Sequence, residues 1–308
     1  MRKLSIVLST SAVVAAAALV WVQAGESQPA PPAKLTIGIY APSVEFGTAQ
    51  ARLQYVQGLA KAIEAKTGIK TDAKSFAAFS QLKSAGVDYA IVEGQCYATN
   101  LGWEVLANAQ IGGSTTRSWA LFSGAGGDMQ GLKGKKLAYV QTGCNDNGFI
   151  DNAMLESEVD PAFFASRVAK PDLTAAVAEV ASYKGAQAVF APSGSQKGLT
   201  KVFDTGAVPN PAFVEINSKL PGALTSQVGE AVRQYGGTGA ISGWAGASKT
   251  PFQGLAGRMG RVVKRGVFAS PEPVRFDAKD VLLEPDTLDE TALTGVRQHF
   301  ERPPARME

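Results

Sequence analysis

LTIGIY (residues 35–40) and VDYAIV (residues 87–92) enclose the segment whose pattern indicates the fold class. Both are short, largely apolar runs of the kind that form buried strands. Between them, residues 49–66 repeat apolar side chains at helical spacing, residues 70–79 predict a second strand, and residues 80–85 predict a short helix. This β-α-β-α-β order predicts a parallel sheet covered by helices.

The same order restarts in the middle of the chain. SWALFS (118–123) predicts a strand, and the glycine-rich residues that follow it predict a turn. Further expected elements are a strand at 136–141, a helix at 147–156, a helix at 173–183 capped by Asp172, and a strand at 186–191. The sequence therefore predicts two α/β units of similar size, joined near residue 118.

The expected division follows from this repetition. Residues 34–118 form a first lobe and residues 119–221 a second. A strand at 213–216 and a helix that Ser218 caps come next, and residues 222–268 are expected to complete the first lobe.

The N-terminus has the three parts of a secretory signal peptide at residues 1–24. Arg2 and Lys3 precede an uncharged apolar run that ends in a small-x-small cleavage site. The alternative is an uncleaved membrane anchor, since the run is about as long as a spanning helix requires. Residues 25–33 are expected to be a flexible leader, and the proline-punctuated residues 269–308 a peripheral tail.

The mature chain is expected to be soluble and close to neutral. The full sequence has 30 basic and 27 acidic residues, and removal of Arg2 and Lys3 leaves 28 against 27, a net charge of +1. A surface without a block of like charge argues against binding to nucleic acid.

Four stretches of the sequence, taken together and in order, form a recognisable set: Leu35–Gly68, LKSAGVDYAIV (82–92), QGLKGKKLAYV (130–140) followed by Thr142-Gly143, and AEVASYKGAQAVF (178–190). This set resembles the type II periplasmic binding proteins, and in particular their phosphate/phosphonate-binding (PhnD-like) branch. The sequence departs from the family pattern where Gln187 replaces a common Asp and where CNDN (144–147) replaces a serine-rich turn.

The resemblance implies a two-lobed α/β fold of the Venus-flytrap type, each lobe a mixed, mostly parallel sheet flanked by helices. It implies a monomeric periplasmic substrate-binding component of an ABC-type uptake system, which captures a small oxyanion such as phosphonate or phosphate and docks on a membrane permease. Three alternatives remain open: a neutral, amphipathic or lipid-like ligand, a sensing role at a receptor, and an enzyme on the same fold.

Ligands of open α/β sheets lie beyond the carboxyl ends of the strands. This rule selects residues after the predicted strands of both units, together with Arg117 before the crossing strand as a clamp for an anion. The candidate ligand-binding residues are Tyr40, Ser43, Glu93, Gln95, Tyr97, Arg117, Thr142, Gly143, Cys144, Asn145, Asn147, Ser193 and Ser195.

TGCNDNG (142–148) is the sharpest of these signals. A glycine turn that enters a helix presents backbone N–H groups to an anion. The alternative is an ordinary helix cap by Asn145 or Asp146, and the Asp146 carboxylate would compete with an anion for the donors. Glu93 would instead suit an amino or other cationic group on the ligand.

Cys96 and Cys144 follow equivalent strands of the two units. We expect them to be separate small residues, one on each rim of the cleft. The alternative is a disulfide across the cleft, which requires Cα atoms within about 7 Å of each other.

Residues for several other chemistries are missing. The one histidine, His299, lies in the tail, so histidine-based catalysis and zinc sites are not expected. The sequence predicts no cofactor, no metal and no enzymatic activity.

Overall fold

The computed structural model describes residues 32–261, except residues 158, 195, 197 and 238. The predicted signal peptide, most of the leader, the tail and Ser195 lie outside the described residues. Within the described part of the chain, no helix has both the length and the hydrophobicity needed to cross a bilayer.

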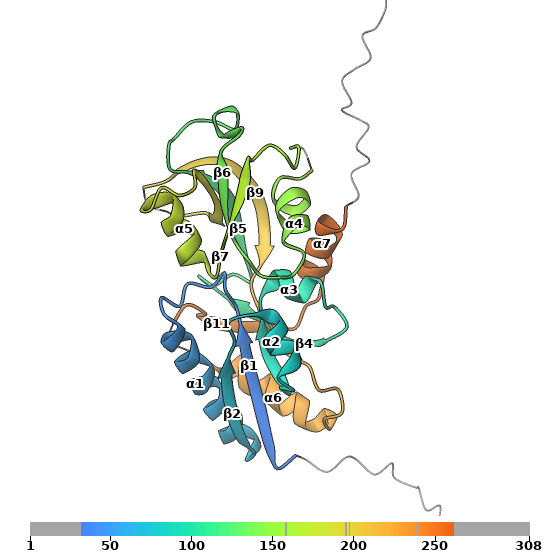
Figure 1. Ribbon diagram of the computed structural model, residues 1–308. Coiled ribbons are helices and arrows are strands. Elements are labelled where there is room, and N and C mark those ends of the chain that lie inside the picture. The colour runs from blue at the N-terminus through green and yellow to red at the C-terminus, as the bar shows by residue number, and fades with distance from the viewer. Residues whose placement is uncertain (1–31, 158, 195, 197, 238, 262–308) are drawn as a thin grey trace, which may run out of the picture. The chain divides into compact units, whose positions relative to one another are not determined.

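The chain is an α/β protein with two mixed sheets flanked by helices (Figure 1). The first sheet has the order β11-β4-β10-β3-β1-β2, and the second has the order β7-β6-β8-β5-β9. The strands are β1 (Lys34–Tyr40), β2 (Lys70–Ser75), β3 (Tyr89–Val92), β4 (Glu104–Gln110), β5 (Thr116–Ser123), β6 (Lys136–Val140), β7 (Ser166–Lys170), β8 (Ala188–Pro192), β9 (Thr200–Pro209), β10 (Ala212–Glu215) and β11 (Gly243–Gly246). The helices are α1 (Ala49–Thr67), α2 (Phe79–Ser84), α3 (Gly94–Ala98), α4 (Asp146–Gly148), α5 (Leu173–Ala181), α6 (Gly222–Gln234) and α7 (Thr250–Met259), with a 3-10 turn η1 (Gln130–Leu132) and a π-helical turn η2 (Phe149–Met154).

The first sheet contains the predicted parallel core. β1 pairs in parallel with β2 and β3, whereas β10 is antiparallel to β3 and β4, and β11 is antiparallel to β4. In the second sheet, β6 is parallel to β7 and β8, and β5 is antiparallel to β8 and β9. The predicted fold class is therefore confirmed, with antiparallel strands added to both parallel cores.

Helix α1 illustrates how local sequence and packing agree. Its first turn is capped by the Thr48 hydroxyl, which accepts a hydrogen bond from Ala51, and it ends at Gly68 with φ of 70°. Its apolar face buries residues such as Val56 and Leu59 in one cluster with Val228 of α6. Each such buried side chain stabilises the fold by roughly 1.5–3 kcal/mol.

Three helix starts test the cap predictions. Asp172 caps α5 as expected, because its carboxylate accepts a hydrogen bond from the Ala175 N–H. The prediction that Ser218 caps the next helix is wrong: α6 begins after Pro221, without a side-chain cap. The helix expected at 147–156 is a short α-turn that continues as the π-helical η2.

The chain passes between the sheets through neighbouring strands. It enters the second sheet by β5 and leaves it by β9, and the Asn210 amide donates to the carbonyls of Ala109 and Ser114 at this crossing. β10 already belongs to the first sheet, so the return occurs by residue 212, earlier than the expected boundary at 222. Helix α7 lies against α3 and η2, and thus contacts elements of both lobes.

Candidate functional site

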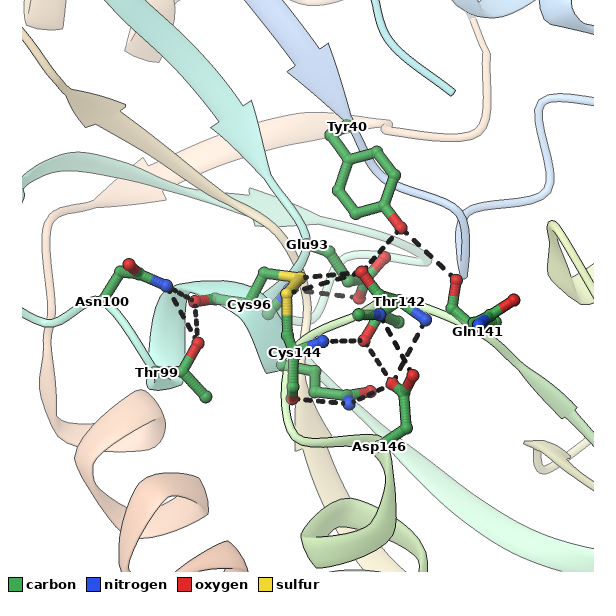
Figure 2. The surroundings of a disulfide bond; sticks show 12 residues. Tyr40, Glu93, Cys96, Thr99, Asn100, Gln141, Thr142, Cys144 and Asp146 are labelled. Carbon is green, nitrogen blue, oxygen red and sulfur yellow. Dashed lines mark hydrogen bonds between the residues drawn. A yellow bond between two sulfur atoms is a disulfide. The ribbon is translucent and has the colours of Figure 1, made fainter. Parts of the chain in front are cut away.

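The two lobes meet beyond the carboxyl ends of β3 and β6. β3 leads through Glu93 into α3, and β6 leads into the turn before α4. A disulfide joins Cys96 of α3 to Cys144 of this turn, with their Cα atoms 5.0 Å apart (Figure 2). The prediction of two separate cysteines is therefore wrong, because the two rims lie well within bridging distance.

Hydrogen bonds between side chains of the first lobe and the turn reinforce this contact. The Gln95 amide donates to the Cys144 carbonyl at 2.9 Å and to Asp146 Oδ1 at 2.9 Å. The Tyr40 hydroxyl donates to the Thr142 carbonyl at 3.0 Å. Segments 93–97 and 142–147 therefore face each other, as the strand-end rule predicts.

The Glu93 carboxylate accepts hydrogen bonds from several donors of the first lobe. Its Oε1 accepts hydrogen bonds from the Ser43 hydroxyl at 2.7 Å and from the Gly94 N–H at 3.1 Å. Its Oε2 accepts one from the Ser43 N–H at 3.0 Å. The residue is only 3% exposed, so this carboxylate is held at a fixed position at the start of α3.

The Asp146 carboxylate accepts hydrogen bonds from several donors of the second lobe. Its Oδ1 accepts from the Thr142 hydroxyl at 2.6 Å and from the Thr142 N–H at 3.2 Å, and its Oδ2 accepts from the Gly143 N–H at 3.0 Å. The turn thus gathers N–H donors at one point, as predicted. Asp146 fills that point itself, so the donors are not free to bind another anion.

Arg117 is engaged at the crossing between the lobes. Its Nε donates to Asn210 Oδ1 at 2.9 Å, and its Nη2 donates to the carbonyl and hydroxyl oxygens of Ser43 at 3.2 and 3.3 Å. Burial lowers the pKa of Arg117, and the nearby charge of Glu93 opposes this effect. The guanidinium therefore holds Ser43 in place, and it is not an open clamp for an anion.

A small cavity lies between the lobes at this point. Its volume is about 20 Å³, which is enough for a single water molecule. Trp119 lines the cavity, is 4% exposed, and has an indole N–H with no partner among the described residues. The lining residues are Ser43, Glu93, Gln95, Trp119, Tyr139, Val140, Thr142, Asp146, Phe149, Ile150, Phe190 and Val208.

The sequence matches no protein-family model and no curated protein. Its fold, however, is similar to several solved structures. PhnD1 from Prochlorococcus marinus in complex with methylphosphonate superposes with a TM-score of 0.56 at 12% identity, over 74% of this chain and 98% of that one. The binding protein component of an ABC phosphonate transporter from Pseudomonas aeruginosa gives 0.55 at 12% identity, over 71% and 83%. A Xanthomonas citri protein bound to chloride gives 0.57 at 13% identity, over 74% and 98%.

The chain has the fold of a type II periplasmic binding protein. At these identities the likeness concerns the fold alone.

Some residues predicted for the cleft lie elsewhere in this binding-protein fold. Tyr97 is buried in the core, where its hydroxyl donates to a backbone carbonyl of its own lobe. Asn145 accepts a hydrogen bond from a helix N–H, and Asn147 accepts one from Arg167. Ser193 is exposed and does not line the cavity.

Most of the apolar wall of the cavity was not among the residues predicted from the sequence. Trp119 and Phe149 pack edge to face, with ring centroids 6.1 Å apart. Phe190 and Val208 come from β8 and β9. Trp119 and Phe190 do lie in strands that the sequence predicts, at 118–123 and 186–191. The alternation of apolar residues alone does not tell which face of a sheet adjoins the cleft. Within the described residues, no group of three or more His, Cys, Asp or Glu side chains could hold a metal.

Proposed function

We propose that this protein is the solute-binding component of an ABC-type uptake system and captures a small molecule between its two lobes. The observation that carries the proposal is the cavity at the lobe junction, to which Glu93 contributes from one lobe and Thr142 and Trp119 from the other. The solved binding proteins of the same fold support it.

Capture would follow from the division of contacts between the lobes. Since each lobe supplies only part of the polar lining, the ligand binds best in the form in which both lobes surround it. The Cys96–Cys144 disulfide keeps the two rims together, so the lobes can separate only to a limited extent around it. We propose that this form docks on a membrane permease, that the protein acts as a periplasmic monomer, and that it performs no catalysis.

Two ligand classes have support. A phosphonate- or phosphate-like oxyanion is supported by the fold neighbours, two of which are described as phosphonate-binding. A neutral, amphipathic or lipid-like ligand is supported by the cavity wall, where aromatic and aliphatic side chains outnumber polar ones.

The test begins with what the protein carries when it is purified. Native mass spectrometry of the mature chain should reveal a stoichiometric small molecule, and that molecule should raise the melting temperature in a concentration-dependent way. Trp119→Phe keeps an aromatic ring, though a smaller one, and removes the N–H for which no described residue is an acceptor, so the ligand-induced shift should shrink. Trp244→Phe is the matched control, because the Trp244 N–H donates to the Tyr55 hydroxyl in the first lobe. Equal effects of the two variants would contradict binding at this cavity.

A further inference from the structure

The hydrogen-bond donors that face the cleft are already occupied by the protein's own carboxylates. Glu93 accepts from both donors of Ser43, and Asp146 accepts from both donors of Thr142. These are the kinds of groups that an oxyanion ligand would need. An entering oxyanion would have to displace a carboxylate that is already held by several hydrogen bonds.

We infer that the cleft selects a small organic cation, whose ammonium group takes the water-sized space beside Glu93 and Asp146. The junction has to widen for the apolar part of this ligand to lie against the aromatic wall. This inference rests on the proposed function and names the ligand class for the same site. Both carboxylates line the one cavity, and within the described part of the chain neither takes part in an ion pair.

The charge balance of the site supports a cationic ligand. Buried charges are normally paired, and Glu93 is almost fully buried. Arg117 is close enough to interact with Glu93, yet its guanidinium is bonded to Asn210 and Ser43 and does not line the cavity. A ligand cation would give Glu93 a charged partner in direct contact.

Each carboxylate also keeps an acceptor site free for a ligand. Glu93 Oε2 and Asp146 Oδ2 each accept one hydrogen bond from the described residues. A carboxylate oxygen can accept two, so each residue can accept a hydrogen bond from an ammonium group without displacing a donor. The field at this point is negative: burial raises the pKa of Tyr40 above its usual range, and the charges of Glu93 and Asp146 raise it further.

The wall of the cavity provides the second, independent observation. Trp119 and Phe149 lie edge to face, and aromatic rings attract cations through their faces. The Arg117 guanidinium already lies over the Trp119 ring, 5.9 Å from its centroid, so Phe149 and Phe190 are the rings left for a ligand cation. No described residue accepts a hydrogen bond from the buried Trp119 N–H, which calls for an acceptor. The ligand expected from this lining is compact and carries an ammonium group, an apolar body and one hydrogen-bond acceptor, such as a hydroxyl.

The experiment compares cations with anions on the mature, oxidised protein. Ethanolamine hydrochloride and 3-aminopropanol hydrochloride are the cationic probes, because each has an ammonium group with N–H donors and one hydroxyl. Sodium methylphosphonate and sodium phosphate are the anionic probes, all at matched ionic strength. We expect the cations to raise the melting temperature and to give measurable calorimetric binding, whereas the anions do neither. Glu93→Gln and Asp146→Asn should each weaken cation binding roughly 10- to 100-fold.

Two further variants make the test specific. Asp204→Asn is the matched control, because Asp204 is an exposed carboxylate on β9 that pairs with Lys201, and this variant should bind the cations as the wild type does. Asp146→Ala removes the carboxylate that fills the turn and should allow methylphosphonate to bind.

The outcomes separate the two proposals. Binding of methylphosphonate or phosphate to the wild type, without binding of either cation, overturns the cation inference and supports the proposed function. Failure of both cations while another solute co-purifies also overturns only the inference. If no probe binds and no solute co-purifies, both proposals fail. The wild-type titrations decide between these outcomes even if a variant does not fold.

Discussion

Removal of the disulfide between Cys96 and Cys144 should lower stability by a large and calculable amount. The two residues are 48 positions apart. Closing a loop of that length removes unfolded-chain entropy equivalent to about 4 kcal/mol at 25 °C, because the term grows with the logarithm of loop length. For a chain of this size, that corresponds to a fall of roughly 8–16 °C in melting temperature.

The assay is differential scanning calorimetry of the mature protein with and without a reducing phosphine, together with a Cys96→Ala/Cys144→Ala variant. The variant should melt at the temperature of the reduced wild type, and the reductant should leave the variant unchanged. If the reduced wild type melts within about 1 °C of the oxidised protein, the disulfide does not stabilise the fold by restricting the unfolded chain, and the expected loss of about 4 kcal/mol is wrong. Titration of free thiols under denaturing conditions checks that the starting material is oxidised.

The remaining predictions concern single positions. Arg117→Ala should lower the free energy of unfolding in urea by about 2–4 kcal/mol, since it leaves buried acceptors without a donor, and Arg117→Lys should lower it less. Gly94→Ala should destabilise by about 1–3 kcal/mol in the same assay, because its Cβ would lie 2.2 Å from the Pro209 carbonyl oxygen, whereas Gly254→Ala in open helix space should not. Burial raises the pKa of Tyr97 to about 12. Tyr97 therefore loses its proton first in the unfolded form. Its contribution to stability should be constant below about pH 10 and be lost as pH rises through 12, so stability should fall less steeply there in Tyr97→Phe; equal slopes would exclude Tyr97 as a cause.

The parallel cores of both lobes could be predicted because local signals agree there. The spacing of apolar residues changes from that of a strand in β1 to that of a helix in α1, and β3 is again a short apolar strand. Gly68 ends α1 at the position where a glycine can adopt the left-handed conformation. By contrast, β9 alternates poorly and is half exposed, so it becomes a strand only through its pairing with β5. Tertiary pairing of this kind leaves no local pattern to detect.

The candidate site was predictable in position but not in detail. The strand-end rule brings Glu93 and Thr142 to the same place, because it depends only on topology. Whether Asp146 fills the turn depends on backbone geometry, in particular the left-handed Asn145 with φ of 57°. The distance between the two cysteines likewise follows from how the lobes pack, which no spacing in the sequence encodes.

The cross-link between Cys96 and Cys144 also bears on how the chain matures. The protein has 2 cysteines, so thiol–disulfide exchange within one molecule has a single product and cannot scramble. The two sulfurs meet because β3 and β6 deliver them to the same rim, and these strands belong to different sheets. The disulfide therefore forms only after both lobes have folded and come into contact, and an incorrect disulfide requires a second molecule.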